Sequence, residues 1–235
     1  MRRRVGTPGM AGIGLVSALG PASGNAAVMG GGASGGWWNN FGAIACDYAA
    51  FQPKGAVSLL ASYTDLTGNG RDCAPGTAPT WDALNGWKFL GASAQYLDCG
   101  WAGPQDQTWS ALAVYTNKTA GSWMWGHTDA GSNVSGFYPR FGDRVNQGGA
   151  QAIFAAPVGA AGVAGYAGRQ GYSGGAPNGP LIGVSVRVGV QNNMMIGTND
   201  PAGGHITAYL QAIVFYSCTL SAVEVAAVSA LMAAL

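Results

Sequence analysis

Charged side chains are scarce in this chain. Only 9% of its 235 residues are Asp, Glu, Lys or Arg, against roughly 25% in an average domain. The formal net charge of +1 gives no field that would attract nucleic acid or an anionic membrane, although Arg2, Arg3 and Arg4 form a local basic run. So little charge is a poor basis for a soluble monomer, which predicts a surface covered by partners or by neutral polar groups.

Long apolar runs are absent as well. None approaches the roughly 18 residues of a membrane helix, so we expect no membrane partner. The three arginines precede a short apolar stretch at residues 10–19, an order that a secretory signal also has. Pro8 and several glycines break the helix that such a signal prefers, so we expect no secretory signal here.

The four cysteines show neither a CxxC pair nor the spacing of metal ligands. A chain of this length can bury a core without disulfides, so we expect buried free thiols. A bridge between Cys73 and Cys99 stays open as the alternative. The four positions are Cys46, Cys73, Cys99 and Cys218.

The chain is rich in short apolar segments separated by turn-forming residues. Gly alone occurs 40 times, and we find no internal repeat and no alternation of strands with helices. Many short strands at regular spacing predict an all-β protein with two packed sheets, a sandwich or jelly roll. The segments expected as strands after residue 85 are 86–89, 95–98, 107–115, 122–126, 136–141, 150–155, 163–170, 181–190 and 194–197.

The end of the chain predicts a long strand that runs into a short helix. From His205 to Cys218 both faces of the strand are largely apolar, which indicates an inner strand. Ser221 is expected to cap the helix, with Glu224 closing a capping box. Strict alternation places Ile206, Ala208, Leu210, Ala212, Val214 and Tyr216 on one face of the strand, and Tyr209, Ile213 and Phe215 on the other.

The first 36 residues differ from the rest, since they consist mainly of Gly, Ala, Ser and Pro without periodicity or aromatic residues. Such a segment has no core of its own. We therefore expect an extended N-terminal arm and linker over residues 1–36, followed by one sandwich domain over residues 37–235. Neighbouring subunits are expected to hold the arm, with Arg2, Arg3 and Arg4 pairing with their acidic surfaces. The alternative is an arm folded back on its own domain.

Several motifs of this chain resemble those of laminin-G-like, concanavalin A-like domains. The turn Asp65–Gly70, the pair of segments 79–81 and 86–89, and the closing strand and helix carry the likeness, which covers about residues 37–235. The segment 52–56 and the Ala-rich terminal helix are similar to copies found in tailed-phage virion proteins. The resemblance implies a two-sheet jelly roll with a short C-terminal helix. It fixes no function, because the fold serves lectins, glycosidases and structural modules.

The glycosidase branch of this fold needs carboxylates clustered on one strand as nucleophile and acid/base. Glutamate occurs once in the chain, at the helix cap, and no two of the aspartates have the alternate spacing that would place them on one strand face. His127 and Asp129 lie close in sequence, but a lone loop histidine beside an aspartate is usually a solvated pair. We therefore predict that the protein is not an enzyme.

Two kinds of binding site remain open. Some domains of the resembling family bind calcium through loop oxygens, and Asp65, Asn69 and Asp72 supply such oxygens, so calcium is a possible cofactor. A glycan site would need an aromatic platform beside amide or carboxylate groups. Trp81, Trp87 and Trp109 match strand positions of the family core, so packing is expected there. The candidates for glycan binding are Trp101, Trp123, Trp125, Tyr138, Asp129 and Asn133.

The sequence as a whole predicts a non-enzymatic structural protein of a phage virion, either a capsid decoration or a tail component. Its jelly roll would be displayed on the particle and its N-terminal arm would anchor it there. The expected partners are other virion proteins and further copies of the chain, assembled in the bacterial host cytoplasm. The alternative function is a module that binds host glycan, as a receptor-binding part of the tail.

Overall fold

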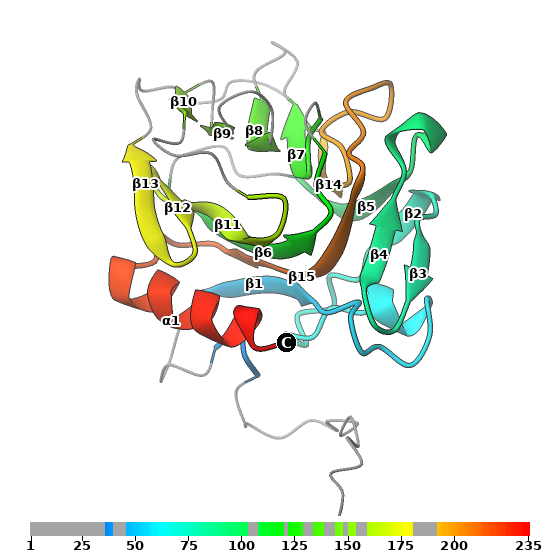
Figure 1. Cartoon of the computed structure of the whole chain (residues 1–235), viewed down its shortest axis with the longest axis horizontal. Helices are drawn as coiled ribbons and strands as arrows, with labels where there is room; N and C mark the ends of the chain where they lie inside the picture. The colour runs from blue at the N-terminus through cyan, green and yellow to red at the C-terminus, as the bar shows by residue number, and fades with distance from the viewer. Residues whose placement is uncertain are drawn as a thin grey trace, which may run out of the picture. The chain divides into compact units, whose positions relative to one another are not determined.

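The computed structural model describes residues 36–39, 46–102, 108–119, 122–128, 134–138, 144–147, 150–153, 159–180 and 192–235. The chain divides into two units, Met1–Gly32 and Ala33–Leu235, and every described residue belongs to the second. That unit is a two-sheet β-sandwich of antiparallel strands with one C-terminal α-helix, as the sequence predicts (Figure 1). Within the described residues, no helix is long and apolar enough to cross a membrane.

One sheet, here called sheet A, carries the helix. Its strands follow the order β13-β12-β11-β6-β15-β4-β3, and β1 also pairs with β15. The central position of β15 confirms the predicted inner strand. The bounds are β1 Asp47–Phe51, β3 Thr80–Asp82, β4 Gly86–Phe89, β6 Ser110–Thr116, β11 Gly162–Ala167, β12 Gln170–Ser173, β13 Ala176–Pro180 and β15 Ala208–Tyr216.

The second sheet, sheet B, has the order β10-β9-β8-β7-β14-β5-β2. In its antiparallel β8–β9 pair, Arg144 lies opposite Tyr138. Two short 3-10 helices, Ala61–Tyr63 and Gly91–Ser93, lie in the connections. The bounds are β2 Ala74–Thr77, β5 Tyr96–Ala102, β7 Trp125–Thr128, β8 Val134–Tyr138, β9 Arg144–Gln147, β10 Ala150–Ile153 and β14 Asn193–Ile196.

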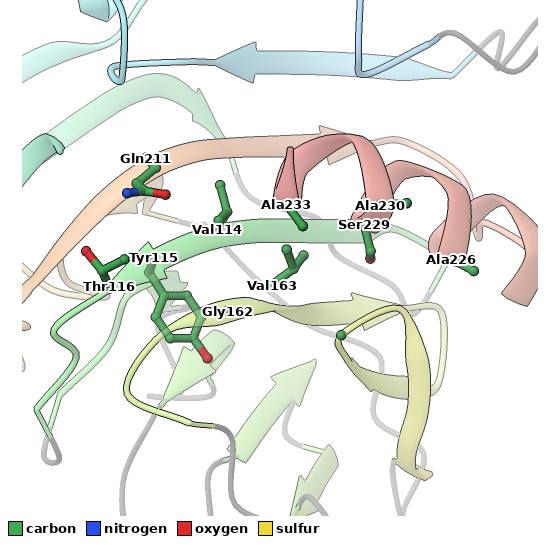
Figure 2. A pocket seen from close by; sticks show the side chains of 11 residues that line it. Val114, Tyr115, Thr116, Gly162, Val163, Gln211, Ala226, Ser229, Ala230 and Ala233 are labelled. Carbon is green, nitrogen blue, oxygen red and sulfur yellow. The ribbon is translucent and has the colours of Figure 1, made fainter. Parts of the chain in front are cut away.

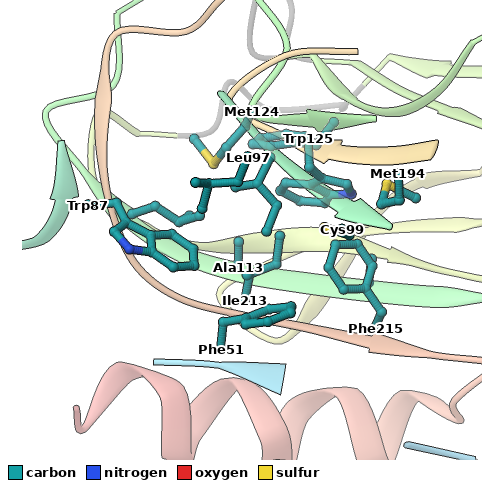
Figure 3. Packing of buried hydrophobic residues seen from close by; sticks show 14 of the residues in the cluster. Phe51, Trp87, Leu97, Cys99, Ala113, Met124, Trp125, Met194, Ile213 and Phe215 are labelled. Atoms are coloured by element: carbon teal, nitrogen blue, oxygen red, sulfur yellow. The ribbon is translucent and has the colours of Figure 1, made fainter. Parts of the chain in front are cut away.

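The main core lies between the two sheets (Figure 3). Trp87 is fully buried there and donates its indole N–H to Ser62 Oγ at 2.7 Å, which satisfies its one polar atom. Trp81 and Trp109 pack against the same cluster while partly buried, so the packing role predicted for these three tryptophans is confirmed. The side chains visible in this core include Phe51, Leu97, Cys99, Ala113, Met124, Trp125, Met194, Ile213 and Phe215.

The alternation predicted for the final strand is wrong in its second half. A bulge lies between Leu210 and Ala212, where β15 pairs with β6. The extra residue, Gln211, reverses the face that each later side chain occupies. Leu210 therefore shares the inter-sheet core with Ile213, while Ala212 and its alternate neighbours face the helix.

The helix α1, Ala222–Ala233, lies on the side of sheet A that faces away from sheet B (Figure 1). Ser221 Oγ accepts the Glu224 amide and the Glu224 carboxylate accepts the Ser221 amide, which confirms the predicted capping box. Leu220 and Val225, on either side of the box, are both buried in the second apolar cluster, between α1 and sheet A. The only glutamate of the chain is thereby committed to holding the helix start.

The expectation of four free thiols is wrong for two of them. Cys46 precedes β1 and Cys218 follows β15, and because these strands pair, the two cysteines meet and form a disulfide. Cys73 and Cys99 are buried free thiols whose Sγ atoms lie 3.3 Å apart. Burial, together with the neighbouring Cys99, raises the pKa of the Cys73 thiol. The predicted alternative of a Cys73–Cys99 bridge is therefore not formed, although the two thiols are neighbours.

A hydrogen bond from Tyr216 holds the segment around Trp38 against the sandwich, and its contribution to stability can be tested. The Tyr216 hydroxyl donates to the Trp38 carbonyl at 2.6 Å, and burial, with Asp47 and Glu224 nearby, raises its pKa. A raised pKa means that the folded state holds the proton more tightly, so this stabilisation is complete below about pH 10 and declines as the pH rises further. Tyr216→Phe should cost about 1 kcal/mol at neutral pH and flatten the alkaline decline. Urea unfolding across the alkaline range measures both, and parallel declines in the two proteins would contradict the assignment.

Candidate functional site

Two of the tryptophans predicted to bind glycan lie in the core instead. Trp125 is fully buried in β7, with its ring centroid 5.0 Å from that of Phe137. Trp101 is 7% exposed and packs between Trp109 and Phe215. The strand pairing that places these indoles between the sheets leaves no ring face for a ligand, so neither is a glycan platform.

Trp123, by contrast, is half-buried and lies two residues before β7, beside residues that are distant in sequence. It forms an isolated parallel β-bridge with His205, and its amide donates to the Gly204 carbonyl at 2.9 Å. The ring centroids of His205 and Tyr96 lie 6.1 Å apart with a tilt of 39°. The backbone bridge thus places Trp123 next to His205, and the His205 ring lies beside that of Tyr96. We call these three half-buried residues the aromatic row.

The loop that carries His205 is held by its own hydrogen bonds. Thr198 Oγ1 donates to the Gly203 carbonyl at 2.6 Å, and Asp200 Oδ1 accepts the Ala202 amide at 2.8 Å. Gly204 has φ +77°, and a Cβ there would lie 2.8 Å from Asn199 Oδ1 and 3.0 Å from a Trp123 ring carbon. Only glycine fits this close approach, so the loop lies directly against the indole. The aromatic row is thus built on a preformed scaffold.

The aromatic row combines ring faces with polar groups, which suits a ligand that has both kinds of surface. Asp200 is half-buried, and the neighbouring residues Pro201, Ala202 and Gly204 are exposed. Within the described part of the chain, His205 Nδ1 is buried without a hydrogen-bond partner, while the imidazole as a whole is half-buried. Aromatic faces stack on the C–H faces of sugars, and nearby polar groups fix the orientation of the hydroxyls.

The residues predicted to bind calcium have a structural task. The Asp65 carboxylate, which is buried, accepts the amides of Ala50, Thr67 and Arg71 at 3.0–3.2 Å and the Thr67 hydroxyl at 2.8 Å. Its oxygens therefore accept protein donors, which gives the carboxylate a structural role, and its role as a calcium ligand stays a prediction. Asp72 Oδ1 accepts the Asp65 amide at 2.8 Å.

The third of these residues, Asn69, donates its side-chain amide to the carbonyls of Asp47 and Tyr48. The loop therefore ties β1 to the segment before β2 through these side-chain hydrogen bonds and through the backbone bond from the Leu66 amide to the Ala50 carbonyl at 2.8 Å. No group of three or more His, Cys, Asp or Glu side chains that could hold a metal is found among the described residues.

Other predicted site residues cannot be placed with the aromatic row. Asp129 and Asn133 lie outside the described residues, as do Arg2, Arg3 and Arg4 of the predicted arm. Tyr138 belongs to β8, but its side chain is not described. His127, expected in a solvated loop, is instead fully buried within β7, because the strand extends two residues beyond the predicted segment.

The aromatic row was only partly predicted. Trp123 is a glycan candidate in the sequence, and Tyr96 lies within the strand expected over residues 95–98. His205 is expected only as the start of the final strand, and nothing in the linear sequence signals that it neighbours Trp123, 82 positions earlier. The β-bridge between two connecting segments creates the row.

Comparison with known proteins supports the fold. No protein-family model and no curated protein sequence matches the chain. Among solved structures, domain 4 of AbnA, a GH43 extracellular arabinanase from Geobacillus stearothermophilus in complex with arabinotriose, is similar with a TM-score of 0.55 and 12% identity over 78% of this chain and 98% of that domain. Trypanosoma rangeli sialidase in complex with sialic acid is similar with a TM-score of 0.53 and 16% identity.

The two likenesses differ in extent. The match to the sialidase covers 82% of this chain but only 33% of the sialidase, so this chain spans about a third of its length. The arabinanase domain matches over nearly its whole length. At these identities the likeness shows the fold alone, a jelly-roll-like sandwich also found in glycosidase-related proteins.

Proposed function

We propose that this chain is a non-enzymatic carbohydrate-binding module. The observation that carries the proposal is the aromatic row of Trp123, His205 and Tyr96, half-buried and fixed by a self-bonded loop. A preformed site of this kind loses little conformational entropy when a sugar binds. The fold adds support, since the similar arabinanase domain was solved with arabinotriose bound.

The chemistry of the acidic residues supports binding without catalysis. Hydrolysis of a glycosidic bond generally needs two carboxyl groups that flank the bond. Glu224 is committed to the capping box, and Asp65 and Asp72 accept backbone amides in a loop. Asp98 and Asp200 lie near the aromatic row in sequence. Asp98 accepts the Gly100 amide and the Asn193 side-chain amide, and Asp200 accepts the Ala202 amide. These contacts support a structural role for these side chains rather than a role in proton transfer.

A glycan array with the full chain tests this function. The wild type should bind a defined set of oligosaccharides and leave them intact. Trp123→Ala and His205→Ala should each weaken binding by about tenfold, because each removes one contact surface of the site. Tyr209→Ala is the matched control, since this half-buried aromatic residue lies on sheet A beside Lys88 and should leave binding unchanged.

The outcomes separate the function from the site. Binding of no oligosaccharide by the wild type would contradict the proposed function. Wild-type affinity in both variants, with binding by the parent, would show that the sugar binds elsewhere. Release of shorter sugars from a bound oligosaccharide would contradict the absence of catalysis.

For its biological setting, we propose the surface of a tailed-phage virion, on the capsid or on the tail. The supporting observations are the low fraction of charged residues and the Gly- and Ala-rich composition of residues 1–36. In this setting the arm anchors the chain to other virion proteins or to further copies, and the sandwich is displayed toward host glycan. Deleting residues 1–36 should abolish incorporation into particles while the sandwich still folds. Normal incorporation of the truncated chain would contradict the anchoring role.

A further inference from the structure

A groove of about 390 Å³ lies between α1 and the outer face of sheet A (Figure 2). It is separate from the aromatic row, which lies beside the connections of sheet B. Strands β6, β11 and β15 form its floor, and one flank of the helix forms its wall. Val114, Thr116, Val163, Gln211, Ala226, Ser229, Ala230 and Ala233 line it, together with Tyr115, Gly162 and Gly174.

Small residues leave this space open. The helix flank that faces the groove carries Ala226, Ala230 and Ala233, which are all exposed. At Gly162 and Gly174 a Cβ would meet no atom within 4 Å, so the backbone borders empty space. The neighbouring Gly175, by contrast, packs tightly, since a Cβ there would lie 3.1 Å from Ala226 Cα and 3.2 Å from Ser229 Cβ. The hairpin between β12 and β13 therefore closes the groove on one side.

A polar atom in the groove, the Ser229 hydroxyl, has no hydrogen-bond partner among the described residues. Ser229 is 4% exposed, and its Oγ is buried without any hydrogen bond. A helical serine ordinarily relieves this cost by bonding to the carbonyl four residues earlier. In Figure 2 the Ser229 hydroxyl points from the helix toward β11, into the groove. Because buried polar groups are rarely left unsatisfied, this hydroxyl marks a position for an external partner.

We propose that the groove binds a small neutral molecule that is mainly hydrocarbon and carries one hydroxyl or carbonyl group. No residue lining the groove is charged. A charged ligand would therefore lose its hydration on binding without gaining an ion pair, so a neutral ligand is favoured. Val114 and Val163, both nearly buried, supply an apolar floor. The ligand's polar group bonds to Ser229 Oγ, and its apolar body lies against the alanine flank of α1. The volume is in the range usual for small-molecule sites.

Titration of the full chain with 2-naphthol, followed by amide NMR shifts, tests this proposal. Saturable shifts are expected at Val163, Gly174 and Ser229. Ala230→Leu should weaken binding by at least about tenfold, because its side chain fills the groove from an exposed helix position. Ala222→Leu is the matched control, since Ala222 is exposed on the same helix but does not line the groove.

Two further comparisons address the polar contact and the charge. Ser229→Ala should weaken 2-naphthol binding by about fivefold and leave binding of naphthalene unchanged. The anion 2-naphthoate should bind far more weakly than 2-naphthol. The proposal is overturned if 2-naphthol shows no saturable shifts, if Ala230→Leu binds like the wild type, or if Ser229→Ala affects both probes equally. An absence of saturable shifts with 2-naphthol would instead favour an apolar side chain of a protein partner as the occupant of the groove.

Discussion

Asp65→Ala is expected to lower the free energy of unfolding by about 3–5 kcal/mol, one of the two largest effects foreseen for a single site. The buried carboxylate accepts the amides of Ala50, Thr67 and Arg71, so its removal leaves donors from β1 and from its own loop without an acceptor. Hydrogen bonds to a charged group are worth more than neutral ones, and orphaned buried donors add a desolvation cost. Urea unfolding of the full chain measures the loss.

The same experiment distinguishes a structural carboxylate from a calcium ligand. If Asp65 acts only through protein donors, neither calcium nor a chelator should shift the unfolding midpoint of the wild type. A midpoint that falls with chelator and recovers with calcium would contradict this interpretation. Asp82→Ala is a suitable control, because Asp82 also accepts backbone amides, at Leu84 and Asn85, but in an exposed turn. It should destabilise the protein less.

The second large effect is expected when the disulfide is removed. Cys46 and Cys218 are 172 positions apart, and a cross-link that closes so long a loop removes much entropy from the unfolded chain. The chain-entropy estimate for such a loop is on the order of 5 kcal/mol, and measured losses are commonly 2–5 kcal/mol. The double variant Cys46→Ser/Cys218→Ser should therefore unfold at a markedly lower urea concentration.

Reduction provides the control for this prediction. Dithiothreitol should destabilise the wild type to the level of the double variant and leave the double variant unchanged, because Cys73 and Cys99 are already free thiols. Equal stability of the wild type with and without reductant would show that the bridge contributes little. Destabilisation of the double variant by reductant would show that the remaining two cysteines are oxidised in the purified protein.

Local rules predicted several elements well. The capping box of Ser221 and Glu224 depends on residues three positions apart, so the sequence alone contains the geometry. The turn from Asp65 onward was likewise expected from its turn-forming residues, and its side-chain hydrogen bonds to Asp65 confirm a compact loop. The packing of Trp87 was expected from the family resemblance, because Trp87 matches a strand position of the family core, and the structure buries it in the main core.

The candidate site was less predictable, because its geometry depends on long-range pairing. Trp125 and Trp123 are two residues apart, and sequence reasoning treated them alike. The first is enclosed between two sheets, and the second lies half-buried where a connecting segment crosses. Periodicity could not separate them, since it does not reveal where a strand begins or which loop covers its end.

The sequence by itself determined that this protein is an all-β sandwich closed by a capped helix, because strand periodicity, turn residues and capping act over a few neighbouring positions. Only the tertiary structure decided which side chains meet. The bulge at Gln211 exchanged the faces of the last strand, the pairing of β1 with β15 joined Cys46 to Cys218, and a bridge placed His205 beside Trp123. Each depends on contacts between segments far apart in the chain, and no local rule encodes their register.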